Sequence, residues 1–337
     1  MTIDDSGSTR RSPLAGFLPV LAGTFAVALA YGLWRAALDR GASLDGVGYR
    51  GAWILAGALK DPWSWLFLLA GLAIPVWRWR QMRWSVLGGG PLRLYAGVLG
   101  LLLVWLSSVY GYNYYLDQFH LADRLLLWLL WGVVLWHPAG LGPLVWWTLV
   151  MQGQFQYPLG SYSLTDIRPL YEQLLLLQIY LAAHALLDWL PAKLPWLARW
   201  QPVLPPFWAL ALCLQAANYL VPGWGKLRMG WLSHDGLADF WLAAYSYGWL
   251  ASIGDERALA LAAWLTRFDL PLLLLTLLVE LGVILILWRR RLTLALLLAM
   301  AGLHVAILAF SGIFFWKWIT LDLLLFYIIR RQDAGET

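Results

Sequence analysis

The chain has 337 residues, of which 61% are hydrophobic, 13% are charged and 25 are tryptophan. Soluble domains carry about a quarter charged residues, so this composition excludes an ordinary soluble protein and predicts an all-α membrane protein. The net charge of +5 comes from basic residues spread over predicted loops and helix ends, which excludes a nucleic-acid-binding surface.

Ten apolar segments that predict membrane spans follow one another along the chain. In chain order they are Gly16–Trp34, Trp63–Trp77, Leu92–Tyr110, His120–Trp136, a segment from the Pro143 turn to Gln154, Thr165–Trp189, Phe207–Leu220, Leu270–Trp288, Leu292–Phe310 and Trp316–Ile329. Residues 1–13 form a polar tail, and the apolar run after it is too long for a cleaved signal peptide. The sequence therefore predicts one polytopic helical domain over residues 14–331 and a second tail at 332–337.

Two connecting segments stand out between the later spans. The exit from the sixth span, Pro191–Pro206, is rich in proline and predicts a loop. Residues 223–268 predict a surface segment on the extracytoplasmic side, and their mixed composition from Ser233 to Phe268 predicts one or two interfacial helices.

The distribution of basic residues predicts the orientation of the spans. With the N-terminus inside, the tight basic clusters all fall on the cytoplasmic side, as the positive-inside rule requires. These cytoplasmic residues are 13 of the 24 Lys and Arg: Arg10, Arg11, Arg78, Arg80, Arg83, Arg93, Lys193, Arg199, Arg289, Arg290, Arg291, Arg330 and Arg331. We therefore expect ten spans with both termini cytoplasmic, which places Lys226 and His120 on the outer face.

We expect four of the ionisable side chains inside the predicted spans to be functional candidates, because a charged group is costly there. They are His184 in the sixth span, Glu280 about halfway along the eighth, His304 in the ninth and Asp322 in the tenth. The competing interpretation is a structural role, in which each group hydrogen-bonds a neighbouring helix.

Lys226 closes the seventh span, which Pro222 and two glycines are expected to end near Leu220. It lies between Trp224 and Trp231, and an amine held in such a dry pocket loses its charge more readily and can act as a general base. The competing interpretation is a lysine that extends its amine to the membrane surface.

His120 and Cys213 are two further residues with reactive side chains. His120 begins the fourth span after an aromatic loop, and three roles are open to it: a base, a hydrogen-bond donor or a helix-end residue. Cys213 is the single cysteine, and we expect a packed core thiol. The sequence has no phosphate-cradling glycine loop, no HExxH motif and no Cys/His metal cluster.

The pattern Tyr-x-x-x-Gly-x-x-Lys-Leu at 219–227, followed by Trp231, resembles the catalytic-lysine segment of vitamin K-dependent γ-carboxylases. It is similar also to their bacterial relatives, the horizontally transferred transmembrane (HTTM) domain proteins. The similarity continues with Leu-Leu-Val-Glu280-Leu, with His304 in Gly-Leu-His-Val-Ala-Ile and with Asp322 in Ile-Thr-Leu-Asp-Leu. It covers about Asn218 to Phe326.

The N-terminal half departs from the family pattern. His120-Leu-Ala-Asp-Arg resembles the segment with the family's active-site histidine, but Phe119 stands where the family has a polar residue. Ser161-Tyr-Ser-Leu-Thr-Asp166 lacks the tryptophan of the family's Trp-Ser-x-Asp segment and lies further from the histidine.

The resemblance implies a lyase reaction coupled to quinol epoxidation, in the inner membrane of a bacterium. Lys226 would deprotonate a reduced naphthoquinone (vitamin K or menaquinol), and O2 would convert the quinol to an epoxide through a strong base. That base would remove a γ-proton from a peptide glutamate, to which CO2 adds. His120 would be a second catalytic residue. The residues expected to bind the quinone are Tyr219, Trp224, Trp231, Glu280 and His304.

Two other classes of function compete with this one. The family's large soluble substrate-capture domain has no counterpart after Arg331, so a peptide substrate would need recruitment from elsewhere, for example by a partner membrane subunit. This favours a membrane accessory or peptide-maturation protein of the same fold. A b-type cytochrome would use pairs from His120, His184 and His304 as haem ligands, but these histidines do not lie at matched depths. In each case the lipid bilayer is the surrounding partner.

Overall fold

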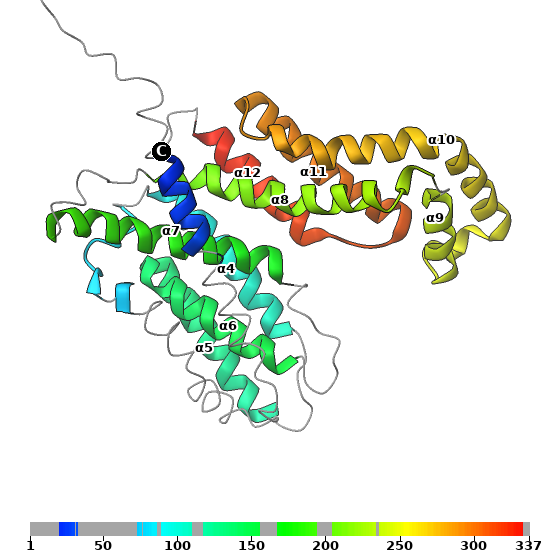
Figure 1. The fold of residues 1–337 in the computed structure, drawn as a ribbon. Coiled ribbons are helices and arrows are strands. Elements are labelled where there is room, and N and C mark those ends of the chain that lie inside the picture. Colours follow the sequence, from blue (N-terminus) through cyan, green and yellow to red (C-terminus); the bar gives the residue numbers. More distant parts are fainter. Residues whose placement is uncertain are drawn as a thin grey trace, which may run out of the picture. The chain divides into compact units, whose positions relative to one another are not determined.

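The computed structural model describes residues 20–30, 32, 73–75, 77–85, 89–109, 117–155, 167–193, 204–233 and 236–332. The chain divides into two compact units, Met1–Phe207 and Trp208–Thr337. Every regular element in these described ranges is a helix, which confirms the predicted all-α class (Figure 1).

The elements of unit 1 are α4 (Gly90–Val109), α5 (Asp117–Trp136), the 3-10 turn η1 (Pro138–Gly140), α6 (Leu141–Phe155) and α7 (Arg168–Lys193). Helix α4 packs against the three helices α5, α6 and α7. Gly97 of α4 lets α5 approach closely, because a Cβ there would lie 2.9 Å from the Leu135 side chain. Trp131 Nε1 donates to the Gly97 carbonyl at 2.9 Å, which satisfies the partly buried indole.

The turn between α5 and α6 is fixed by His137, whose ring is buried. Its Nδ1 accepts from the Ala139 N–H at 3.1 Å, so its Nε2 carries the proton and donates to the Trp79 carbonyl at 3.0 Å. The ring also stacks on Trp79, with centroids 3.5 Å apart. His137 therefore joins the segment before α4 to the end of α5.

Unit 2 contains the long helices that carry the candidate site. Its elements are most of α8 (Phe207–Arg228), η4 (Trp231–Ser233), α9 (Gly236–Ser246), η5 (Ala251–Ile253), α10 (Asp255–Gly282), η6 (Val283–Leu285), α11 (Arg290–Ser311) and α12 (Trp316–Arg331). Figure 1 shows α9 beside the first half of α10, and α11 beside α12.

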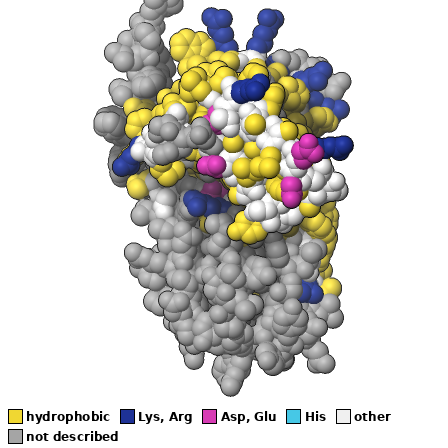
Figure 2. Space-filling view, turned by 90° about the vertical axis from the view of Figure 1, so that its right-hand side faces the viewer, with side chains coloured by type: hydrophobic (Ala, Val, Ile, Leu, Met, Phe, Trp, Pro, Cys, Tyr) yellow, Lys and Arg dark blue, Asp and Glu magenta, His cyan; other side chains and the backbone are white. Residues whose placement is uncertain are grey.

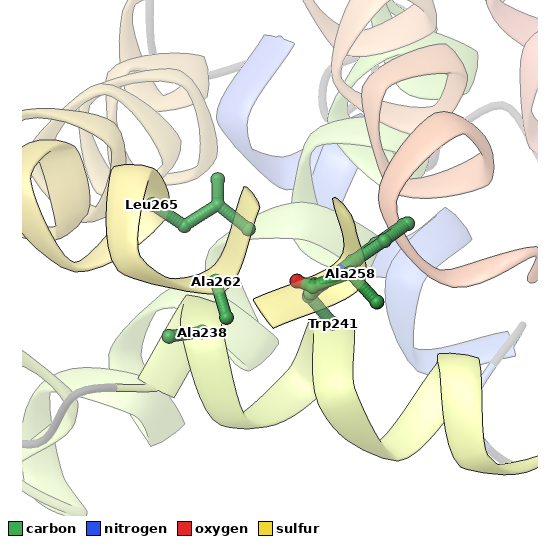
Figure 3. Packing of buried hydrophobic residues seen from close by; sticks show 5 residues of the cluster. All are labelled: Ala238, Trp241, Ala258, Ala262 and Leu265. Carbon is green, nitrogen blue, oxygen red and sulfur yellow. Dashed lines mark hydrogen bonds between the residues drawn. The ribbon is translucent and has the colours of Figure 1, made fainter. Parts of the chain in front are cut away.

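The packing of α9 on α10 depends on one large and several small side chains. Figure 3 shows Trp241 of α9 against Ala258 and Ala262 of α10. Trp241 is fully buried, and its Nε1 donates to the Ala258 carbonyl at 3.0 Å. Asp269 of α10 accepts from the Leu237 N–H at 3.0 Å, which supplies the first turn of α9 with a buried carboxylate.

Four described helices are long and apolar enough to cross a membrane: Gly90–Ser108, Arg168–Leu187, Asp255–Leu285 and Arg290–Ser311. In the last two, only 28% of the most apolar window is buried inside the protein. Their exposed side chains include Leu274, Leu278 and Val305. Figure 2 shows hydrophobic side chains exposed over the described part of one face, with charged side chains among them. Such a surface fits a lipid bilayer.

The predicted spans agree with most of the described helices. The third, fourth, fifth, ninth and tenth spans match α4, α5, α6, α11 and α12 to within a few residues. The first span is helical over Val20–Ala30, and most of the second lies outside the described residues. The predicted N-cap of the sixth span, Thr165–Asp166, also lies outside them, and α7 extends through Pro191 to Lys193, so the predicted loop began too early.

The prediction that the seventh span ends near Leu220 is wrong. Helix α8 continues through Pro222, Gly223 and Gly225 to Arg228. Proline removes only one backbone hydrogen bond of the helix, so α8 continues with Pro222 inside it. Cys213 was expected in the core and is instead exposed, because it lies on the opposite side of α8 from its buried face.

The eighth span was also placed wrongly. The predicted second interfacial helix and the eighth span form one continuous helix, α10, which begins at Asp255 instead of Leu270. Ala258, Ala262 and Leu265 recur at helical spacing and pack on α9, so this mixed segment folds as the first half of α10. Glu280 consequently lies two residues before the end of α10, not halfway along a span.

Candidate functional site

A polar stripe runs along one face of α8. Gln215, Tyr219, Gly223 and Lys226 are separated by four, four and three residues, the spacing that places side chains on one side of a helix. Each of the four contacts a residue of α10, α11 or α12 within unit 2. The stripe therefore organises the polar interior of this unit.

At the end of the stripe, Lys226 forms a salt bridge with Glu280 of α10. Lys226 Nζ donates to Glu280 Oε1, and the two side chains are 21% and 7% exposed. Nζ also lies 4.6 Å from the ring centroid of Trp231, which η4 holds beside the helix end. A largely buried charge pair of this kind is stable only while both members are present.

The two helices approach closely at Gly223. A Cβ on this residue would lie 2.8 Å from Glu280 Cβ and 3.3 Å from Glu280 Oε2. Glu280 Oε2 is buried and has no hydrogen-bond partner, and the same is true of Asn218 Nδ2, eight residues before Lys226 on α8. Pro222 additionally leaves the Asn218 carbonyl without its helical N–H. Glu280 Oε2 is therefore a buried, unpaired acceptor beside Gly223, one turn before Lys226.

The middle of the stripe is a buried hydrogen-bond network centred on Tyr219. Its hydroxyl donates to Asp322 Oδ2 at 2.5 Å and contacts His304 Nδ1 at 3.0 Å. Gln215 Nε2 donates to Asp322 Oδ1 at 2.6 Å. Because the phenol has one proton and gives it to Asp322, His304 Nδ1 donates to the phenol oxygen.

Aromatic rings enclose this network. His304 lies 5.1 Å from the ring of Phe315 and 6.1 Å from the ring of Trp318, centroid to centroid. Trp318 also lies 5.9 Å from Tyr219. The rings exclude water from the hydrogen bonds and hold the imidazole in place.

The salt bridge and the network belong to one site. Lys226 and Tyr219 lie on the same polar face of α8, and their partners Glu280 and His304 face them from α10 and α11.

Most of the residues predicted for the site are brought together. Lys226, Tyr219, Glu280, His304 and Trp231 lie in one site with Asp322. The prediction missed Gln215, Phe315 and Trp318. Gln215 could have been predicted from the sequence, because it lies four residues before Tyr219 and therefore on the same face of the helix.

Three predicted residues lie elsewhere. Trp224 is 60% exposed, on the side of α8 away from Lys226. His120 lies in the first turn of α5 in unit 1, and its side chain is outside the described residues. His184 lies in α7 of unit 1, with its ring 6.4 Å from that of Tyr180.

The described residues contain no group of three or more His, Cys, Asp or Glu side chains that could hold a metal ion. Comparison with known proteins found no matching family model, no matching curated protein and no matching solved structure. The carboxylase-like interpretation therefore stays a prediction that rests on the sequence motifs.

Proposed function

We propose that the chain is a membrane-embedded, quinol-dependent enzyme of the carboxylase-like class, with Lys226 as its base. The observation that supports this most is the buried Lys226–Glu280 pair beside the unpaired Glu280 Oε2, next to the Tyr219 network. Ionisable groups in a membrane helix bundle are costly and commonly functional.

Glu280 is the natural acceptor for the proton of Lys226. A proton that moves from the ammonium group to the carboxylate leaves a neutral amine and a neutral acid, and the pair carries no net charge before or after. The neutral amine can then accept a proton from a substrate hydroxyl.

The residues around Lys226 fit a reduced naphthoquinone. A quinol has two hydroxyl groups and a flat aromatic ring, and the surroundings of Lys226 offer the unpaired acceptor Glu280 Oε2 and the indole of Trp231. When bound, the quinol with O2 supplies the strong base that removes the γ-proton of a peptide glutamate before CO2 adds. Lys226, Tyr219 and His304 would orient it, and the surrounding aromatic rings would exclude water.

The proposal includes an orientation in the membrane. We propose ten spans in a bacterial inner membrane, with both termini cytoplasmic. Single cysteines at residues 5 and 335 in a Cys213→Ser background would report this. Labelling of either site in intact cells by an impermeant maleimide would contradict the orientation.

Quinol epoxidation by the purified protein tests the chemistry. We expect wild type to convert menaquinol or phylloquinol to the epoxide and Lys226→Ala to lose that activity. Lys317→Ala is the matched control, because Lys317 also lies beside a tryptophan ring, with its Nζ 5.9 Å from the centroid of Trp316. Epoxidation by Lys226→Ala at the wild-type rate would remove the lysine from the mechanism.

A wild-type protein that forms no epoxide would instead favour the accessory or peptide-maturation protein. A Soret band in the purified protein would favour the haem alternative.

A further inference from the structure

A second feature of unit 2 is an apolar cavity formed by α9, α10 and α11, with a volume of about 310 Å³. Ala299, Gly302 and Ala306 of α11 recur on one face and are too small to fill the space. Leu272, Leu275 and Val279 of α10 line the opposite wall. A Cβ on Gly302 would meet nothing within 4 Å, so the cavity reaches the backbone of α11.

The chemistry of the wall restricts what can bind. Thr276 is the one polar residue in the lining, and its hydroxyl already donates to the Leu272 carbonyl at 2.9 Å. A ligand with polar groups would therefore lose hydrogen bonds with water and find none here. A cavity of this size is at the lower end of the range of small-molecule sites, roughly 300–1,000 Å³.

The surroundings indicate where such a ligand comes from. The walls belong to α10 and α11, the two candidate spans with the smallest buried share. Leu278 and Val305 on the same helices are exposed, which fits a face turned to lipid. A hydrocarbon chain is the one apolar ligand that a bilayer supplies at high concentration.

We propose that this cavity binds the hydrocarbon chain of a membrane lipid, either acyl or isoprenoid. The inference does not depend on the proposed function. Val279 and Leu303 line the cavity, while the next residues, Glu280 and His304, belong to the polar site. A chain in the cavity therefore packs on the helices that hold the polar site, without entering it.

Photo-crosslinking in nanodiscs tests the proposal. Two probes distinguish the sources: a phospholipid with a diazirine near the end of its acyl chain, and a geranylgeranyl alcohol with the same group. We expect saturable labelling of peptides from α10 residues 272–279 and α11 residues 299–310 by at least one probe. Excess unlabelled lipid of the same kind should compete.

Gly302→Leu is the variant that fills the cavity, because its side chain enters open space. We expect it to reduce the labelling about tenfold or more, since the chain loses most of its apolar contacts. Gly132→Leu is the matched control, because Gly132 is a helical glycine of α5 that also has nothing within 4 Å of a Cβ. This control should label as wild type does.

Two results would overturn the proposal. One is labelling of wild type that does not saturate and that spreads evenly over exposed residues such as Leu278 and Leu298, as bulk lipid would give. The other is unchanged labelling in a folded Gly302→Leu protein. The saturation experiment uses wild type alone, so it decides the question even if the variant fails to fold.

Discussion

Gly223 of α8 and Glu280 of α10 lie so close that no side chain fits between them: a Cβ on Gly223 would come within 2.8 Å of Glu280 Cβ. This contact holds the carboxylate where Lys226, one turn further along α8, reaches it. The glycine that looks like a helix-ending signal in the sequence is therefore the residue that lets two helices form the salt bridge.

Gly223→Ala should destabilise the protein by about 1–3 kcal/mol, because the added methyl group overpacks the contact with Glu280. Gly225→Ala is the control, since a Cβ there meets nothing within 4 Å. It should be neutral or stabilising by about 0.5–1 kcal/mol, the usual gain for alanine in a helix. Thermal melting in detergent, followed by circular dichroism, compares the two. Equal effects would contradict the close contact.

Removal of one member of the salt bridge should cost far more than removal of both. Lys226→Met leaves Glu280 buried and uncompensated, and Glu280→Gln leaves the ammonium group without its carboxylate. We expect about 3–5 kcal/mol for each single change and a smaller loss for the double variant. Denaturation of all four proteins in a double-mutant cycle measures the coupling. Strictly additive losses would mean that the two groups do not interact.

Tyr219→Phe should destabilise unit 2 by about 1–3 kcal/mol, because it leaves Asp322 Oδ2, which is fully buried, without its donor. Tyr245→Phe removes a similar bond, from the hydroxyl to Asp255 Oδ1 at 2.7 Å, at an exposed position. We expect that control to change stability by less than about 0.5 kcal/mol. A loss in Tyr245→Phe as large as that in Tyr219→Phe would show that burial is not what makes the Tyr219 bond matter.

We expect the stability of the protein to depend on pH through His137. Burial lowers the pKa of this histidine; the hydrogen bond to the Trp79 carbonyl opposes the shift, and the charge of Arg83 adds to it. Because the pKa is lower in the folded state, the contribution to stability is fully present above the unfolded value of about 6.5. It is lost as the pH falls through the folded pKa.

Melting temperatures of wild type and His137→Gln, measured from pH 7.5 down to pH 4.5, test this prediction. Wild type should lose stability faster than the variant as the pH falls. Parallel curves would mean that the pKa of His137 is the same in the folded and unfolded states. The other groups that titrate in the range are common to both proteins and cancel in the difference.

The all-helical class and most helix positions followed from the sequence, because a long apolar run has few folded forms in a membrane and the helix satisfies its backbone. The residues of the polar site were also visible, since Glu280, His304 and Asp322 are ionisable groups in apolar runs. The errors in helix boundaries fell at Pro191, at Pro222 and Gly223, and in the 255–268 segment, where local signals suggested boundaries.

Only the tertiary structure decided what those signals mean. Gly223 is required by the approach of α10, which no local pattern of α8 reveals. The bonds of Tyr219 to His304 and Asp322 join residues 85 and 103 positions apart in the chain. The cavity at Gly302 likewise exists because small residues on α11 face α10 across a helix interface. Sequence periodicity determines the face of a helix, whereas contact between two faces depends on how the helices pack.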